Sequence, residues 1–182
     1  MKKKKIAVLV GSLRKESFNR KLANEMIAMA PDDLDMELLE IGQLVHYNED
    51  LDFDPPAEWV AFRKKIKDAD GFLFFTPEYN RSVSGVLKNA IDIASRPYNQ
   101  NNWSGKPGAI VSSSIGQLGG VVAHHALRQP LVALNVHMMQ LPETYISNTM
   151  SLFGEDGKLV KEETRTFLRN YLQAFEAWVF KF

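Results

Sequence analysis

The chain has 182 residues, of which 45% are apolar and 24% charged, and its formal net charge is zero. This length and composition are typical of one folded domain, and we expect a single domain over residues 1–182. The neutral balance argues against electrostatic capture of nucleic acid or of an anionic membrane. The absence of cysteine excludes disulfides, thiolate nucleophiles and cysteine-bound metals.

The N-terminal residues superficially resemble a signal peptide, because the lysines of Lys2–Lys5 precede the apolar run Ile6–Val10. That run is interrupted at Gly11 and Ser12 and ends at Arg14, which is too short for such a segment. No apolar run approaches the roughly 18 residues that would span a bilayer. We therefore expect a cytoplasmic protein that does not act on a membrane.

The first third of the chain predicts two strands and one helix. Residues 5–10 form a continuous apolar run, as expected for a strand that is covered on both faces of a parallel sheet. Apolar residues recur at helical spacing over 19–30, and Pro31 favours a helix end there. Residues 35–41 alternate well enough for a more exposed strand. The polar, proline-containing segment 42–56 predicts a long surface loop, and such loops are often functional or lie at interfaces.

The middle of the chain repeats this alternation. Residues 57–69 have apolar side chains at helical spacing and predict a helix, which Asp70-Gly71 would end. The short, aromatic run 71–76 predicts a central strand. A polar loop and a helix over 86–95 follow, and residues 107–113 predict the next strand.

The last third begins with a glycine-rich loop over 114–120 and a predicted helix over 121–134. Residues 137–145 predict a fifth strand. A final helix closes the chain, with these apolar residues on one face: Leu168, Tyr171, Leu172, Phe175 and Val179.

Five strands alternating with five helices predict a parallel α/β sheet with right-handed crossovers and helices on both faces. For a chain of this length the strand order 2-1-3-4-5 is the economical arrangement, and it places ligands where strands one and three end. Three polar loops follow strands one, three and four. In this order their strand ends are neighbours, so we expect the loops to converge on one crevice.

The loop Gly11–Asn19 has the features of a phosphate site. Ser12, Ser17 and Asn19 offer neutral donors, Arg14 offers a guanidinium fork, and the next helix presents unpaired backbone N–H groups. Ser17 or Asn19 could equally cap that helix, and capping does not exclude phosphate binding. The loop has neither the Gly-Lys-Ser/Thr of a mononucleotide P-loop nor the Gly-x-Gly-x-x-Gly of dinucleotide-binding folds.

The other two loops have the residues to hold a flat heterocycle, but each could also be an ordinary connection. Pro77–Gly85 combines a rigid proline with an aromatic side chain and an amide. Ser112–Gly120 contains glycines that would let the backbone approach a ring closely.

Other catalytic classes fit the residues poorly. The histidines lack carboxylates at metal-ligand spacing, so we expect no metal site. The chain has no Gly-x-Ser-x-Gly motif of a serine hydrolase. The alternating Asp50, Asp52 and Asp54 lack the glycine turn and downstream glutamate of a calcium loop.

Four motifs in order resemble the NADPH-dependent FMN reductase family. They are Gly11-Ser12-Leu13-Arg14-x-x-Ser17-x-Asn19, Pro77-Glu78-Tyr79-Asn80, Leu87-Lys88-Asn89-Ala90-Ile91-Asp92 and Gly105-Lys106-Pro107. The similarity covers nearly the whole chain and is weakest over 42–56 and after Ser147. Within the family, the chain looks most like the bacterial quinone and chromate reductases. Ser84 and Arg81 depart from the family pattern, since relatives often have proline and a variable, often aromatic, residue there.

The resemblance implies a flavodoxin-like three-layer α/β/α sandwich with a five-stranded sheet and tightly bound FMN. In this family's pattern, the first loop holds the phosphate, the second flanks the isoalloxazine and ribityl groups, and the third closes the other side. The implied cofactor-binding residues are Ser12, Arg14, Ser17, Phe18, Asn19, Pro77, Glu78, Tyr79, Asn80, Arg81, Ser113, Ser114 and Gly116. It also implies a homodimer with the active site near the subunit boundary, and leaves a homotetramer open.

The function implied is hydride transfer from NADPH or NADH through FMN to an acceptor such as a quinone, free flavin, azo compound or chromate. The flavin would carry the chemistry, so no catalytic side chain is expected. Two alternatives are a flavodoxin-type electron carrier without its own reductase activity and a flavin-free regulatory domain. The sequence leaves open the physiological acceptor, the preferred nicotinamide cofactor, and the roles of Arg81 and of the loop 42–56.

Overall fold

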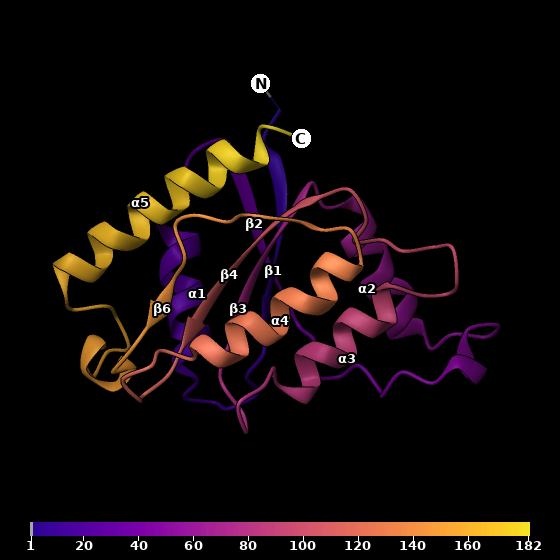
Figure 1. Cartoon of the computed structure of the whole chain (residues 1–182), viewed down its shortest axis with the longest axis horizontal. Helices are drawn as coiled ribbons and strands as arrows, with labels where there is room; N and C mark the ends of the chain where they lie inside the picture. The colour runs from indigo at the N-terminus through magenta and orange to yellow at the C-terminus, as the bar shows by residue number, and fades with distance from the viewer. Residues whose placement is uncertain (1) are drawn as a thin grey trace.

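The computed structural model describes residues 2–182 and contains a parallel sheet between two layers of helices (Figure 1). The strand order β2-β1-β3-β4-β5 confirms the predicted order 2-1-3-4-5. The strands are β1 (Lys4–Val10), β2 (Leu34–Leu39), β3 (Gly71–Thr76), β4 (Pro107–Ser113), β5 (His137–Met138) and β6 (Tyr145–Ile146). The helices are α1 (Phe18–Ala28), α2 (Ala57–Asp68), α3 (Gly85–Ala94), α4 (Val121–Ala133) and α5 (Glu162–Val179), with short 3-10 turns η1 (Glu49–Leu51) and η2 (Thr149–Leu152). Both the five helices and the flavodoxin-like topology agree with the sequence prediction.

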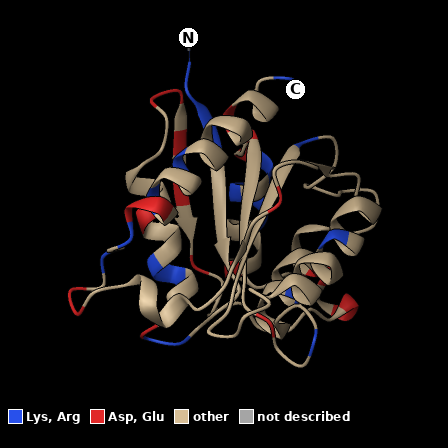
Figure 2. Cartoon of the chain, turned by 60° about the vertical axis from the view of Figure 1, so that its left-hand side comes forward, with Lys and Arg blue, Asp and Glu red and all other residues tan. Residues whose placement is uncertain are grey.

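The central strands are apolar because both of their faces are covered. Alternate residues of β3 enter two different cores: Phe72 and Phe74 pack with α2, α3 and α4, and Leu73 and Phe75 pack with α1 and α5. A strand with one solvent-facing side would instead alternate apolar with polar residues. Figure 2 shows the result, since the charged residues lie on the helices, the loops, the edge strand β2 and the start of β1, while β3 carries none. No helix within residues 2–182 has the length and apolar character needed to cross a membrane.

The predicted fifth strand at 137–145 is two short strands. Both β5 and β6 pair in parallel with β4, but the chain between them leaves the sheet edge. Pro142 lies in this exposed excursion and has no N–H to donate to a neighbouring strand. Pairing resumes where the Ser112 N–H donates to the Thr144 carbonyl at 3.1 Å.

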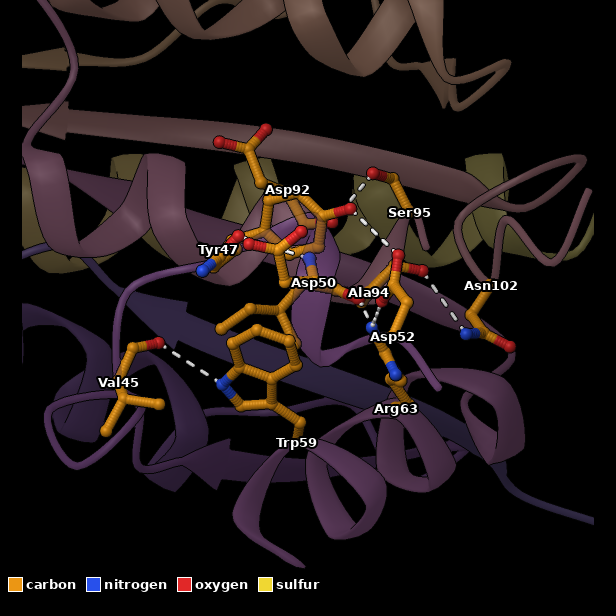
Figure 3. A network of polar contacts seen from close by, with 12 residues as sticks. Val45, Tyr47, Asp50, Asp52, Trp59, Arg63, Asp92, Ala94, Ser95 and Asn102 are labelled. Carbon is orange, nitrogen blue, oxygen red and sulfur yellow. Dashed lines mark hydrogen bonds and ion pairs between the residues drawn. The ribbon is translucent and has the colours of Figure 1, made fainter. Parts of the chain in front are cut away.

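The loop 42–56 is held against the helices by buried polar contacts. The Asn89 side chain on α3 donates to the carbonyls of Leu44 and Val45 and accepts from the Tyr47 N–H, at 3.1, 3.2 and 2.8 Å. Farther along, Asp52 accepts from the Tyr47 hydroxyl at 2.9 Å and from Arg63 at 2.7 Å (Figure 3). These contacts explain how a long polar segment keeps a single conformation.

Replacing Asn89 with alanine should release this loop. The variant removes three hydrogen bonds from a buried side chain, so we expect a loss of about 2–3 kcal/mol in the free energy of unfolding. Urea denaturation would measure the loss, and hydrogen exchange should accelerate most over 42–56. Asn170→Ala, at an exposed position of α5, is the control, and it should neither lower the free energy of unfolding nor accelerate exchange over 42–56. Unaltered exchange over 42–56 in Asn89→Ala would contradict this role.

Candidate functional site

The candidate site depends on the alignment of three strand ends. Val10 of β1 pairs with Phe75 of β3, and Phe75 pairs in turn with Val111 of β4. Because all three strands run in the same direction, the loops that follow them start side by side at one edge of the sheet (lower edge in Figure 1). This is the edge at which open α/β sheets bind their ligands.

A cavity of about 200 Å³ lies between these loops. It is lined by Ser12, Arg14, Ser17, Phe18, Asn19, Pro77, Glu78, Tyr79, Ser113, Ser114, Ile115 and Thr149. The structure therefore brings together most of the residues that the sequence predicts for cofactor binding. The exceptions are Asn80, Arg81 and Gly116, which do not line the cavity.

The first loop delivers the N-terminus of α1 to this cavity. The buried Ser17 caps the helix, since its hydroxyl accepts a hydrogen bond from the Arg20 N–H at 3.2 Å. Ser12 and Asn19 are also buried, while Arg14 is exposed at the rim. A helix start with hydroxyl, amide and guanidinium donors is a suitable environment for an anion.

Three buried polar groups on the cavity wall have no hydrogen-bond partner within residues 2–182. They are the Asn19 side-chain oxygen and the hydroxyls of Ser113 and Thr149. An unsatisfied buried polar group costs about 1–3 kcal/mol, and proteins rarely retain several in one place without compensation. A bound molecule rich in hydroxyl and phosphate oxygens would supply the missing partners, so the residues present fit the phosphate and ribityl parts of FMN.

The tip of the second loop is a tight turn. Tyr79 and Ser82 exchange backbone hydrogen bonds of 3.1 and 3.0 Å, and Asn80 and Arg81 between them have φ of 51° and 61°. Positive φ at both central residues defines a type I′ turn. Both residues are exposed, and neither lines the cavity, although their chain neighbours Glu78 and Tyr79 do.

Glu78 ties the second loop to helix α4. Its Oε2 atom accepts from the backbone N–H groups of Val122 and Ala123 at 3.1 and 3.2 Å, and its Oε1 atom accepts from Arg81 at 2.9 Å. The N-cap of α4 is Gly120, which has no side chain to satisfy these amides, so Glu78 caps the helix from another loop. The Glu78 carboxylate therefore holds the second loop against the start of α4. The sequence alone does not predict this contact.

In the third loop two glycines are required by the backbone itself, and the predicted approach of Gly116 to a ring stays a prediction. A Cβ on Gly119 would lie 2.7 Å from the Tyr145 backbone carbon, and Gly119 and Gly120 have φ of 58° and 78°. A Cβ on Gly116 would lie 3.6 Å from the Ser114 hydroxyl, an ordinary contact distance, and the Gly116 carbonyl accepts from the Asn148 N–H at 3.3 Å.

Sequence reasoning missed two residues of the wall, Ile115 and Thr149. Thr149 joins the wall because its N–H donates to the Ser114 carbonyl at 3.2 Å. The available signal was its position directly after the last strand, whose end reaches the same edge of the sheet.

A pair of histidines lies on α4 near this edge. His124 is 2% exposed, packs edge-on against Tyr145 at 4.8 Å, and has no partner for either ring nitrogen within residues 2–182. Burial, and then the nearby His125 and Arg128, lower the pKa of His124 to about 4. The ring is therefore neutral near pH 7 and holds no proton to donate as an imidazolium. The described residues contain no group of three or more His, Asp or Glu side chains arranged to hold a metal ion.

A larger groove of about 410 Å³ lies elsewhere, between β2 and α2. Its charged rim includes the ion pair between Lys65 and Glu37 at 2.8 Å. None of the partnerless buried polar atoms within residues 2–182 belongs to this groove. The smaller cavity is therefore the better candidate for a specific site.

Removing the Glu78 carboxylate should destabilise the contact between the second loop and α4. In Glu78→Ala two amides at the start of α4 lose their acceptor, so we expect a loss of about 1–2 kcal/mol in the free energy of unfolding. Chemical denaturation at pH 7 would measure it, with Glu155→Ala at an exposed loop position as the control. Equal stability of both variants and the parent would show that the cap contributes nothing.

The chain is similar to known flavoenzymes over most of its length. Residues 4–151 match the family model described as NADPH-dependent FMN reductase. A quinone reductase of Pseudomonas putida is 53% identical over 175 residues, which cover 96% of this chain and 94% of that protein. A 2-hydroxy-1,4-benzoquinone reductase of a Burkholderia species is 46% identical, with 96% of each chain covered. The solved structure of FerB, a flavoenzyme NAD(P)H:(acceptor) oxidoreductase from Paracoccus denitrificans, superimposes with a TM-score of 0.92, 43% identity and 98% coverage of both chains.

Proposed function

The chain belongs to the NADPH-dependent FMN reductase family, and on that premise we propose that it passes a hydride from NAD(P)H through bound FMN to a small acceptor such as a quinone. The observation that carries the proposal is the cavity at the strand ends, where three buried polar groups beside a helix N-terminus have no partner among residues 2–182. The named activities of the relatives support the same reaction class.

The proposed FMN site has two parts, the cavity for the phosphate end of the cofactor and the open mouth for its ring. Ser12, Arg14, Ser17 and Asn19 would hold the phosphate at the start of α1, and Ser113 and Thr149 would bind the adjoining oxygens. The enclosed volume of about 200 Å³ is below the range of about 300–1,000 Å³ usual for whole ligand sites. The ring would therefore lie at the open mouth, where half-exposed Tyr79 and Ile115 stand.

When bound, FMN supplies the capacity to accept a hydride from a nicotinamide and to return electrons to a second molecule. The chain's own contribution is binding and orientation. Glu78 is occupied by the amides of α4 and by Arg81, and His124 is buried with a lowered pKa, so it holds no imidazolium proton to donate near pH 7. Access to the mouth would then decide between a quinone, free flavin, azo compound or chromate as acceptor.

The proposed working form is a homodimer, with a homotetramer as the open alternative. Exposed apolar side chains on and beside α4 support it, namely those of Leu118, Val122 and Val132. Phe53, at the end of the firmly held loop 42–56, is 98% exposed and would also be covered by a second copy. The cytoplasmic location expected from the sequence and the single domain over 1–182 stay predictions.

The purified protein tests the proposal against the electron-carrier alternative. Protein isolated without added cofactor should be yellow or become yellow with FMN, and should oxidise NAD(P)H faster when a quinone is added. A flavodoxin-type carrier would bind FMN but leave NAD(P)H unoxidised unless a separate reductase were present. A protein that neither contains nor takes up FMN would refute the central assignment.

The partnerless hydroxyls allow cofactor binding to be weakened without harming the fold. In the double variant Ser113→Ala, Thr149→Val the apo protein loses no hydrogen bond, so its stability should not fall. Each lost contact to FMN is worth about 0.5–1.5 kcal/mol, so the Kd for FMN should rise about tenfold. Flavin fluorescence titration would measure the Kd.

Ser84→Ala provides the matched control. Its hydroxyl is equally buried and partnerless but does not line the cavity, so FMN affinity should be retained. An unchanged Kd in the double variant, or an equal loss in the control, would remove the two hydroxyls from the binding site.

A further inference from the structure

Arg81 occupies a backbone conformation that does not favour arginine. It is the second central residue of the type I′ turn, with φ of 61°. Glycine fits that position without steric cost, and asparagine, as at Asn80, tolerates it better than most residues. The turn itself therefore gives no reason for an arginine there.

The Arg81 side chain is nevertheless held in place. Glu78 is fixed by two backbone amides of α4, and its second oxygen accepts from the Arg81 Nη1 atom at 2.9 Å. The Glu78 side chain is 12% exposed and that of Arg81 is 67% exposed. A partly buried carboxylate thus anchors an exposed guanidinium, and within residues 2–182 the guanidinium donates to no other group. A guanidinium has five N–H donors, so most of those of Arg81 stay available to another molecule.

The Arg81 guanidinium and the phosphate end of the cavity belong to different loops. Glu78 and Tyr79, its neighbours in the turn, line the cavity, but Arg81 does not. The phosphate end is formed by the start of α1 together with Arg14, on a different loop. Arg81 is therefore placed to meet a molecule that enters at the mouth.

We propose that Arg81 binds a phosphate group of the nicotinamide dinucleotide and so determines which reductant is used. The inference rests on the proposed function, because it takes the mouth to be where NAD(P)H enters. A planar guanidinium fork matches two phosphate oxygens, and it is the group that accommodates the 2′-phosphate of NADP in other folds. Both NADH and NADPH carry a pyrophosphate and only NADPH carries the 2′-phosphate, so the two cofactors distinguish the phosphate that is bound.

The test uses the FMN-loaded protein with NADP⁺ and NAD⁺ as calorimetric probes. Arg81→Asn suits the positive φ and removes the fork, and Arg81→Lys keeps the charge without the fork. We expect the Kd for NADP⁺ to rise about tenfold in Arg81→Asn and less in Arg81→Lys, with a parallel rise in KM for NADPH and parent-like FMN content. A loss confined to NADP⁺ identifies the 2′-phosphate, and an equal loss for NAD⁺ identifies the pyrophosphate.

Arg169→Asn is the matched control, since it removes an arginine of similar exposure from α5. Dinucleotide affinities within twofold of the parent in Arg81→Asn, or an equal loss in Arg169→Asn, would overturn the inference. So would a loss of FMN or a changed KM for the acceptor alone, because Arg81 would then act on another molecule. Failure of the parent holoenzyme to oxidise NAD(P)H would instead refute the proposed function.

Discussion

The alignment of Val10, Phe75 and Val111 across three parallel strands is the constraint on which the site depends. Parallel pairing alone would place the strand ends at one edge of the sheet. This register also makes the three loops begin at the same height along the strand direction. The register is in turn fixed by alternation, because a shift of one residue would exchange the side chains of the two cores. The apolar strands therefore position polar residues that they never contact.

Hydrogen bonds between the loops and their neighbours then hold the walls of the site in position. Glu78 connects the loop after β3 to the start of α4, and the Thr149 N–H connects the chain after β6 to the loop after β4. Each contact joins a backbone group left unpaired by regular structure to an acceptor supplied by another segment. Of the buried side-chain groups that still lack a partner within residues 2–182, those of Asn19, Ser113 and Thr149 belong to residues that line the cavity.

The elements of this fold could be predicted because periodicity and burial determine them locally. The strands 71–76 and 107–113 are found with the predicted bounds, and most of the predicted binding residues line one cavity. The break in the fifth strand was missed although the sequence carries a signal for it, since Gln140, Pro142 and Glu143 interrupt the residues 137–145 and proline cannot donate to a neighbouring strand. The capping role of Glu78 and the exposure of Asn80 depend on a turn and a distant helix end, which residue spacing does not encode.

The turn that contains Arg81 also has a consequence for how the substrate preference of such enzymes changes in evolution. The residues at the start of α1 and the residues at the tip of the second loop belong to separate segments, and the hydrogen bonds of Glu78 tie the second loop to α4 rather than to α1. Exchanging a side chain at the tip leaves the hydrogen bonds of the α1 start intact. A lineage can therefore explore new reductants or acceptors through single substitutions without passing through forms that have lost their prosthetic group.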